Sequence, residues 1–218
     1  MVPLVRGLLV SDIFDKLPDD VKDAVSDKVL QWVEGNLRAA DAKSFPTLVA
    51  LLNYHQEDVA KAVWWIVKPG FRPVAELIAS LFAVAGQGSQ QSVDPSAVDV
   101  KGAELGEDDV KGLKELVLAM VVKEDMKPRF EKAVSAFESL KPEERVARTV
   151  KFVNYMIERQ RKAGSRQAAA EFLELLKQYP EPWIYMLYML RPEKRTAALR
   201  VFLAVLEKSV ELSSFAPP

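Results

Sequence analysis

The stretch of sequence that decides the fold class is KPEERVARTVKFVNYMIERQRKA, residues 141–163. It opens on Pro142, Glu143 and Glu144. A proline followed by acids is typical of the first turn of a helix, where the amides are unpaired and the helix dipole is positive. Apolar residues then recur at spacings of three and four, which places them on one face of a helix: Val146, Val150, Val153 and Ile157. The stretch therefore predicts a long amphipathic helix.

The same pattern extends over nearly the whole chain. Alternating β-branched runs are scarce, and prolines and glycines stand at the ends of the periodic segments. After a short N-terminal helix, the spacing predicts helices over residues 18–36, 44–54, 56–68, 73–86, 108–122, 127–139, 142–163, 165–178, 181–190 and 192–212. The expected fold class is an all-α helical bundle.

The two halves of the chain resemble each other. LPDDV at 17–21 and KPEERV at 141–146 each open a long helix, and WIVKP at 65–69 lines up with YMLRP at 188–192. The alignment predicts two similar units of four to five helices each, as a tandem duplication would give. They are an acidic helical unit over residues 1–86 and a basic helical unit over 108–218. A polar linker over 87–107, with few large apolar residues, joins them and should be a loop or mobile. The competing interpretation is that amphipathic helices of similar length always align to some extent.

The composition of the 218 residues excludes several kinds of chemistry. There are no cysteines and one histidine, which excludes disulfides, thiolate metal sites and any two-histidine site within one chain. His55 stands among turn residues without a nucleophile nearby in the sequence, so we interpret it as a hydrogen-bonded turn residue rather than a general base. No calcium-loop spacing and no glycine-rich phosphate loop occurs. We expect a protein that is not an enzyme and has no catalytic residue, metal, cofactor or evident small-molecule substrate.

Charge is distributed unevenly along the chain. Residues 1–109 carry 10 basic and 17 acidic side chains, and residues 110–218 carry 20 and 14, although the whole chain has a net charge of −1. Such asymmetry predicts an electrostatic partner or self-association of unlike ends.

Part of the positive charge of the second half follows one stripe of the long helix. Bases and aromatic residues alternate there at spacings of three and four: Arg145, Arg148, Phe152, Tyr155, Arg159, Lys162 and Arg166. Bases neutralise phosphates and rings stack on unpaired bases, so the stripe predicts a nucleic-acid surface, extended by Arg191, Lys194 and Arg195. In the alternative interpretation the aromatic residues pack on a neighbouring helix and the bases are solvated.

Two further features predict protein interfaces. The helix of the first half that corresponds to 142–163 carries an acidic stripe, Asp20, Asp23, Asp27 and Glu34, which would suit a head-to-tail contact with the basic stripe of another copy. The segment 183–190 is apolar all round and contains Trp183, Tyr185 and Tyr188, so it lies either in the core or in an interface.

The sequence thus predicts a cytoplasmic, non-enzymatic helical assembly or scaffold protein without membrane contact. Its partner would be nucleic acid, through the basic stripe of the second half. The alternative is a protein–protein interaction module or homo-oligomer that binds no nucleic acid. The scarcity of asparagine beside many lysines and glutamates also favours a thermophilic source.

Overall fold

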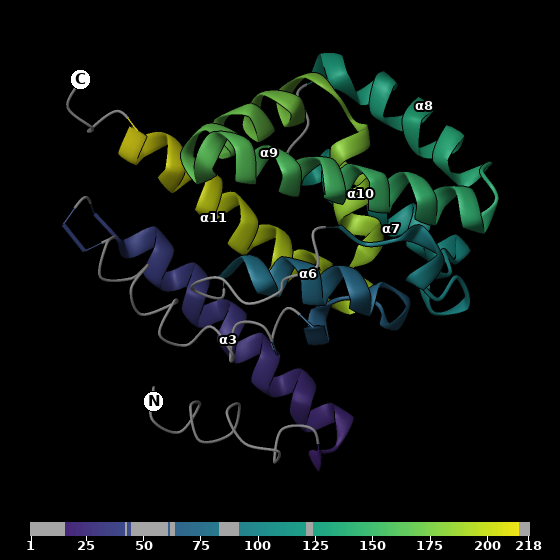
Figure 1. Cartoon of the computed structure of the whole chain (residues 1–218), viewed down its shortest axis with the longest axis horizontal. Coiled ribbons are helices and arrows are strands. Elements are labelled where there is room, and N and C mark those ends of the chain that lie inside the picture. The colour runs from purple at the N-terminus through teal and green to yellow at the C-terminus, as the bar shows by residue number, and fades with distance from the viewer. Residues whose placement is uncertain are drawn as a thin grey trace. The chain divides into compact units, whose positions relative to one another are not determined.

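A computed structural model of the chain describes residues 16–41, 43–44, 61, 64–82, 92–120 and 124–213. These residues form helices and turns without a β-strand, which confirms the all-α prediction for them. The α-helices are α3 (Asp19–Ala39), α6 (Arg72–Phe82), α7 (Glu107–Met120), α8 (Lys127–Glu138), α9 (Pro142–Gln178), α10 (Glu181–Met189) and α11 (Arg195–Ser213), as Figure 1 shows. The 3₁₀ helices are η1 (Pro69–Phe71), η2 (Pro95–Ala97), η3 (Lys101–Ala103), η4 (Glu124–Met126) and η5 (Pro192–Lys194).

Several predicted elements lie outside the described residues. They are the short N-terminal helix, the helix over 44–54, most of the helix over 56–68, and His55. The predictions made for them stay predictions.

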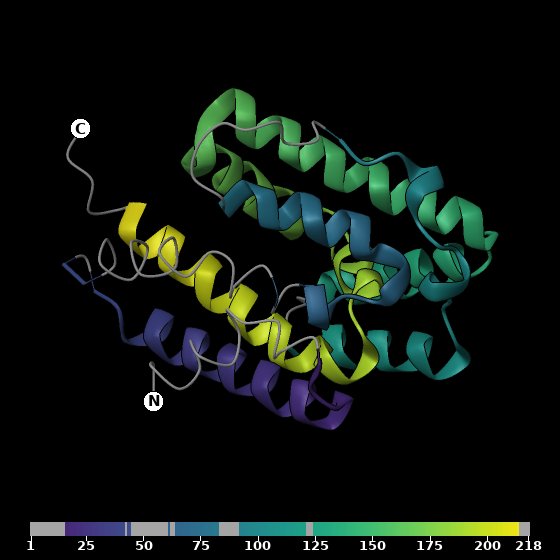
Figure 2. The same ribbon diagram turned by 60° about the horizontal axis from the view of Figure 1, so that its bottom comes forward.

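The predicted helices 142–163 and 165–178 are joined in α9, which reverses its direction along its length. Arg159 and Glu171 are hydrogen bonded, although twelve residues of straight helix would separate them by about 18 Å. The rings of Phe152 and Phe172 lie 6.1 Å apart between centroids, where twenty residues of straight helix would span about 30 Å. The two arms of α9 therefore pack side by side, as two separate helices would, and Figure 2 shows the green ribbon folding back.

The chain divides into two compact units that cut across the predicted boundaries. The first unit combines Met1–Val67, Ala75–Gln91 and Thr196–Pro218, and the second combines Lys68–Val74 and Ser92–Arg195. The last helix thus belongs to the same unit as the start of the chain, instead of closing a separate unit over 108–218. Counted over these units, the net charge is −4 in the first and +3 in the second, so the asymmetry is weaker than between the two halves.

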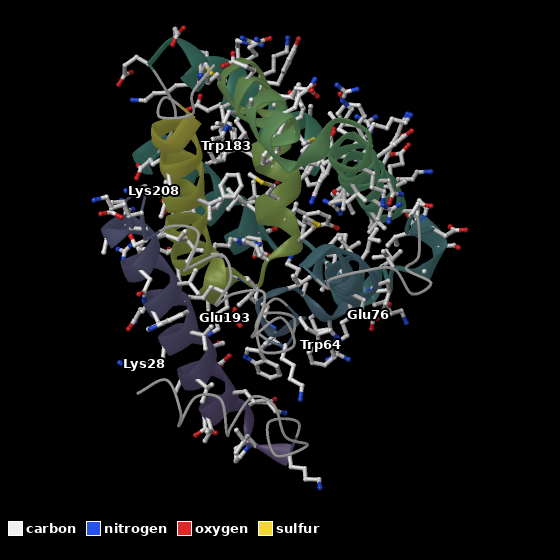
Figure 3. All side chains as sticks on the ribbon, turned by 60° about the vertical axis from the view of Figure 1, so that its left-hand side comes forward. Lys28, Trp64, Glu76, Trp183, Glu193 and Lys208 are labelled. Atoms are coloured by element: carbon white, nitrogen blue, oxygen red, sulfur yellow. The ribbon has the colours of Figure 1, made fainter. Side chains whose placement is uncertain are left out.

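In the first unit, α3 and α11 pack side by side (Figure 2). Leu37, Ala40 and Ala204 form the buried centre of this contact, and Arg38 bridges Glu34 and Glu207 at 3.0 and 3.1 Å. A second cluster surrounds Trp65, whose indole Nε1 donates to Asp23 at 2.7 Å. Figure 3 shows Lys28 on the opposite, outer side of α3.

In the second unit, the core is a row of aromatic rings centred on α10. Neighbouring rings lie 5.1–6.1 Å apart between centroids, in the order Phe71, Tyr188, Phe137, Tyr185, Phe152 and Phe172. Edge-to-face and tilted pairs at this distance stabilise a core beyond the area they bury. Trp183, seen among the helices in Figure 3, is 4% exposed and donates its Nε1 to the carbonyl of Leu176 at 2.9 Å.

The described part of the predicted linker is a packed segment rather than a mobile loop. Val93, Val98 and Ala103 are 0–4% exposed. The side-chain amide of Asn154 in α9 donates to the carbonyl of Val93 and accepts from its N–H, at 2.8 and 2.9 Å. The segment is thus a loop in its backbone, as one of the two predicted alternatives has it, and it is packed because its small apolar residues are buried under α9 and η1.

The backbones of η1 and η3 approach each other closely at two glycines. A Cβ added to Gly70 would lie 2.2 Å from the carbonyl oxygen of Asp99, and one added to Gly102 would lie 2.7 Å from the nitrogen of Gly70. The N–H of Asp99 donates to the carbonyl of Gly70 at 3.2 Å. Only glycine fits at both positions, because the obstructing atoms belong to the backbone.

We expect Gly70→Ala and Gly102→Ala each to lower the free energy of unfolding by about 1–3 kcal/mol, since the added methyl group must push two backbone segments apart. The matched control is Gly112→Ala within α7, where an added Cβ meets no atom within 4 Å. That change should raise the stability by about 0.5–1 kcal/mol, because alanine favours a helix interior. Urea unfolding followed by circular dichroism measures all three, and equal stabilities of the Gly70 and Gly112 variants would contradict the close approach.

Local structure repeats at the two aligned junctions, although the duplication as a whole stays a prediction. Lys68 and Arg191 have similar non-helical backbones, with ψ 144° and 138°, and each is followed by a three-residue 3₁₀ helix that starts on proline. Each 3₁₀ helix then runs into an α-helix, α6 or α11.

Candidate functional site

The exposed face of α9 carries only part of the predicted basic stripe. Arg148, Tyr155 and Lys162 are exposed, Arg145 and Arg159 are partly buried, and the side chain of Arg166 lies outside the described residues. The helix start on Pro142, with the carboxylate of Glu144 accepting from the N–H of Lys141 at 3.1 Å, fixes which residues face outward.

Acids within the fold neutralise two of the predicted bases. Arg159 donates from Nε and Nη2 to the carboxylate of Glu171 at 2.8 and 2.5 Å. These hydrogen bonds raise the pKa of Arg159 and lower that of Glu171. Lys162 pairs with Glu158 at 2.5 Å, and this hydrogen bond lowers the pKa of the Glu158 carboxyl. Both bases therefore have an acidic partner within the fold, although the exposed pair of Lys162 and Glu158 is screened by solvent.

Other members of the stripe lie in the fold instead of on its surface. The ring of Phe152 packs between Phe172 and Tyr185, as the alternative interpretation of the aromatic residues foresaw. Lys194 and Arg195 are 2% and 3% exposed, and Arg191 is half-buried with Glu193 at 3.9 Å. These three bases therefore do not extend the predicted nucleic-acid surface. The prediction failed because side-chain spacing does not show whether other parts of the chain cover the start of a helix.

A smaller cluster of side chains does remain on the outer face of α9. Arg148, Lys151 and Tyr155 are exposed and follow one another at spacings of three and four residues. The tyrosine is 48% exposed, so its ring is accessible to a stacking partner. Lys151 was missing from the predicted stripe, although the same spacing would have found it. We call these three residues the α9 patch.

The acidic stripe of α3 is also partly engaged within its own unit. Asp23 accepts from Trp65, and Glu34 accepts from Arg38. Asp23 and Asp27 are half-buried, and only Asp20 of the four predicted acids is exposed. Helix α3 therefore does not present a continuous acidic surface for head-to-tail docking.

The aromatic residues predicted for a protein interface lie in the core. Trp183 and Tyr188 are 4% and 1% exposed, and Tyr185 is half-buried against Phe137 and Phe152. Burial raises the pKa of Tyr188 to about 12. The core interpretation of segment 183–190 is the one that the structure supports, because η1, α8 and α9 all place rings against it.

The structure also brings together a buried ionic cluster that the sequence did not predict. Asp109 in α7 accepts from Nη1 of Arg195 at 2.8 Å, and Nζ of Lys68 lies 3.6 Å from its other oxygen. Nζ of Lys68 also donates to the carbonyl of Glu104 at 2.6 Å and lies 4.9 Å from the ring centre of Tyr188. Side-chain exposure is 7% for Lys68, 4% for Arg195 and 12% for Asp109.

The pKa values within this cluster reflect its burial and its excess of positive charge. Burial lowers the pKa of Lys68 to about 8, assisted by Arg195 and Arg145 and opposed by Asp109. For Asp109, burial alone would raise the pKa. The N–H of Gly106 and the two neighbouring cations together lower it by more, so the net shift of the pKa is downward. Lys68 is therefore close to half protonated at weakly alkaline pH.

Other kinds of site are sparse in the part of the chain that the structure describes. No group of three histidine or carboxylate side chains there is arranged to hold a metal ion. No described helix has the length and hydrophobicity needed to span a membrane. An open surface pocket of about 400 Å³ is lined by Asp125, Met126, Arg129, Lys177, Gln178 and Tyr179, and Arg129 is fixed in it by the carbonyl of Gln178 at 3.0 Å.

The chain was compared with known families, proteins and structures. No family model, no curated protein and no solved structure matches it. The function must therefore be argued from the residues themselves.

Proposed function

We propose that this protein is a non-enzymatic helical scaffold whose α9 patch binds single-stranded nucleic acid. The observation that carries the proposal is the exposed ring of Tyr155 close to two cations, Arg148 and Lys151, on one helical face. Within the described residues, no hydrogen bond or ion pair occupies either cation. The acids that neutralise the stripe pair with Arg159 and Lys162 instead.

The chemistry of the patch suits an unpaired strand. Two cations contact two phosphates, and a base stacks on the ring of Tyr155, one turn beyond Lys151 on the same face. Stacking of this kind contributes about 1–3 kcal/mol per base. With two phosphate contacts, the logarithm of the binding constant should fall with the logarithm of salt concentration with a slope of about −1.4. Binding at such a small surface is expected to be weak and sequence-tolerant.

The test is fluorescence anisotropy with a labelled single-stranded oligonucleotide at low salt. Arg148→Glu/Lys151→Glu should abolish binding, and Tyr155→Ala should weaken it about tenfold or more, through loss of the stacking contribution. The control is Lys101→Glu/Lys132→Glu, which makes the same change in net charge at two other exposed lysines. Equal binding by both double variants, or no binding by the wild type at low salt, would contradict the proposal.

A second candidate function is self-association without nucleic acid. It rests on the opposite net charges of the two compact units, −4 and +3. Oppositely charged regions on identical chains give head-to-tail contacts that weaken with salt. Light scattering should then show a mass that falls as salt is raised, whereas a mass of one chain at every salt concentration counts against it.

A further inference from the structure

A buried guanidinium nitrogen in the second unit has no protein partner. Arg195 donates from Nε to the carbonyl of Leu187 at 3.0 Å and from Nη1 to Asp109 at 2.8 Å. Its Nη2 is buried and has no hydrogen-bond partner among the described residues. A buried charged donor left unpaired costs more than the 1–3 kcal/mol of a neutral one, so such a group calls for an occupant.

A second arginine places another unpaired donor in the same region. Arg145, in the first turns of α9, donates from Nη1 to the carbonyl of Glu138 at 3.2 Å. Its Nε is buried and likewise has no partner in the described part of the chain. Arg145 lies within electrostatic range of both Lys68 and Tyr188, and these residues adjoin Asp109 and Arg195.

The charge around these donors is out of balance. Lys68 and Arg195 contact a single carboxylate, Asp109, and Arg145 lies within electrostatic range of Lys68. Glu193 also lies within electrostatic range of Arg195, but its side chain is 53% exposed, so it offsets little of the buried charge. The remaining hydrogen-bond partners of the cluster are carbonyl oxygens of Glu104, Glu138 and Leu187, which carry no full charge. Burying an uncompensated charge costs several kcal/mol per ion, and an anion would offset that cost where a water molecule would not.

We propose that the side chains of Arg145 and Arg195 form a buried site for a small monovalent inorganic anion, of the size of chloride. Nη2 of Arg195 and Nε of Arg145 donate to the anion, and Lys68 adds attraction at longer range. The anion brings the cluster to two negative and three positive charges. The site is separate from the α9 patch and does not rest on the proposed function.

The proposal predicts that chloride stabilises the fold through one saturable site. The probe is sodium chloride exchanged for sodium gluconate at constant ionic strength. For a site half filled at about 30 mM, the unfolding equilibrium constant falls about tenfold between zero and 0.3 M chloride. Chloride-35 NMR reports binding directly, because the line broadens in the presence of protein and sharpens again when bromide competes.

Variants separate this site from general salt effects. Arg195→Lys keeps the charge but removes Nη2, and Arg145→Lys keeps the charge but removes Nε; each should lose most of the chloride dependence and the broadening. Arg145→Lys serves alone if the Arg195 variant does not fold. Arg200→Lys, at an exposed arginine of α11, is the matched control and should behave as the wild type. Equal stability of the wild type in chloride and gluconate, or broadening that survives in Arg145→Lys, overturns the proposal.

Discussion

Replacing Asp109 with alanine is expected to lower the free energy of unfolding by about 3–5 kcal/mol, because it leaves buried cations without their carboxylate. Nη1 of Arg195 would lose an acceptor at 2.8 Å and Nζ of Lys68 an ion pair at 3.6 Å. The N–H of Gly106, which donates to Asp109 at 3.0 Å at the start of α7, would lose its acceptor as well. Urea unfolding at pH 7 measures the change.

The control for this prediction stands on the same helix. Glu115 is 68% exposed and lies 3.9 Å from Lys111, so Glu115→Ala should change the stability by no more than about 0.5 kcal/mol. Asp109→Asn retains a hydrogen-bond acceptor but loses the negative charge, so its loss of stability should lie between those of Asp109→Ala and Glu115→Ala. A loss of less than about 1 kcal/mol in Asp109→Ala would show that Lys68 and Arg195 find another compensation.

Local features of the fold could be predicted from the sequence because they depend on neighbours within a few turns. Pro142 followed by two acids marked the start of α9 correctly, and the all-round apolar segment 183–190 indicated a central helix. The division into units could not be predicted. Helical periodicity shows which face of α11 is buried, but not that α3 supplies part of the surface against it.

The candidate site could be predicted even less well, because its surface depends on contacts between residues far apart in the sequence. Spacing placed Arg148, Tyr155 and Arg159 on one stripe, but Glu171 reaches Arg159 only because α9 folds back on itself. Arg195 looked like another surface base, although its carboxylate partner Asp109 stands 86 residues away in the sequence. A buried ion pair between residues far apart in the sequence produces no helical periodicity, so it could not be predicted from spacing. The sequence singled out Lys68 only as part of the alignment of residues 65–69 with residues 188–192.

The pH dependence of stability is expected to be unusual, because the protein should become more stable as the pH rises from 8 to 10. The pKa of Lys68 is lowered from 10.5 to about 8 in the fold, chiefly by burial. Between these values the unfolded chain binds the proton and the folded protein does not, so the free energy of unfolding rises with pH. The slope approaches about 1.4 kcal/mol per pH unit, and the whole window is worth about 3 kcal/mol. Above pH 10 the gain is opposed by Tyr188, whose pKa of about 12 in the fold makes its ionisation favour unfolding.

Lys68→Met isolates this contribution, since methionine retains the apolar stem of the side chain and removes the titrating group. The variant should lose the rise between pH 8 and 10. At pH 7 it should be less stable than the wild type by no more than about 1 kcal/mol, because burying the protonated amine costs nearly as much as its contacts contribute. Urea unfolding in chloride-free gluconate buffer keeps anion binding out of the comparison. Exposed Lys132→Met is the control and should retain the full slope. A wild-type stability that falls steadily from pH 8 to 10 would mean that Lys68 stays protonated in the fold, and that Asp109 outweighs its burial.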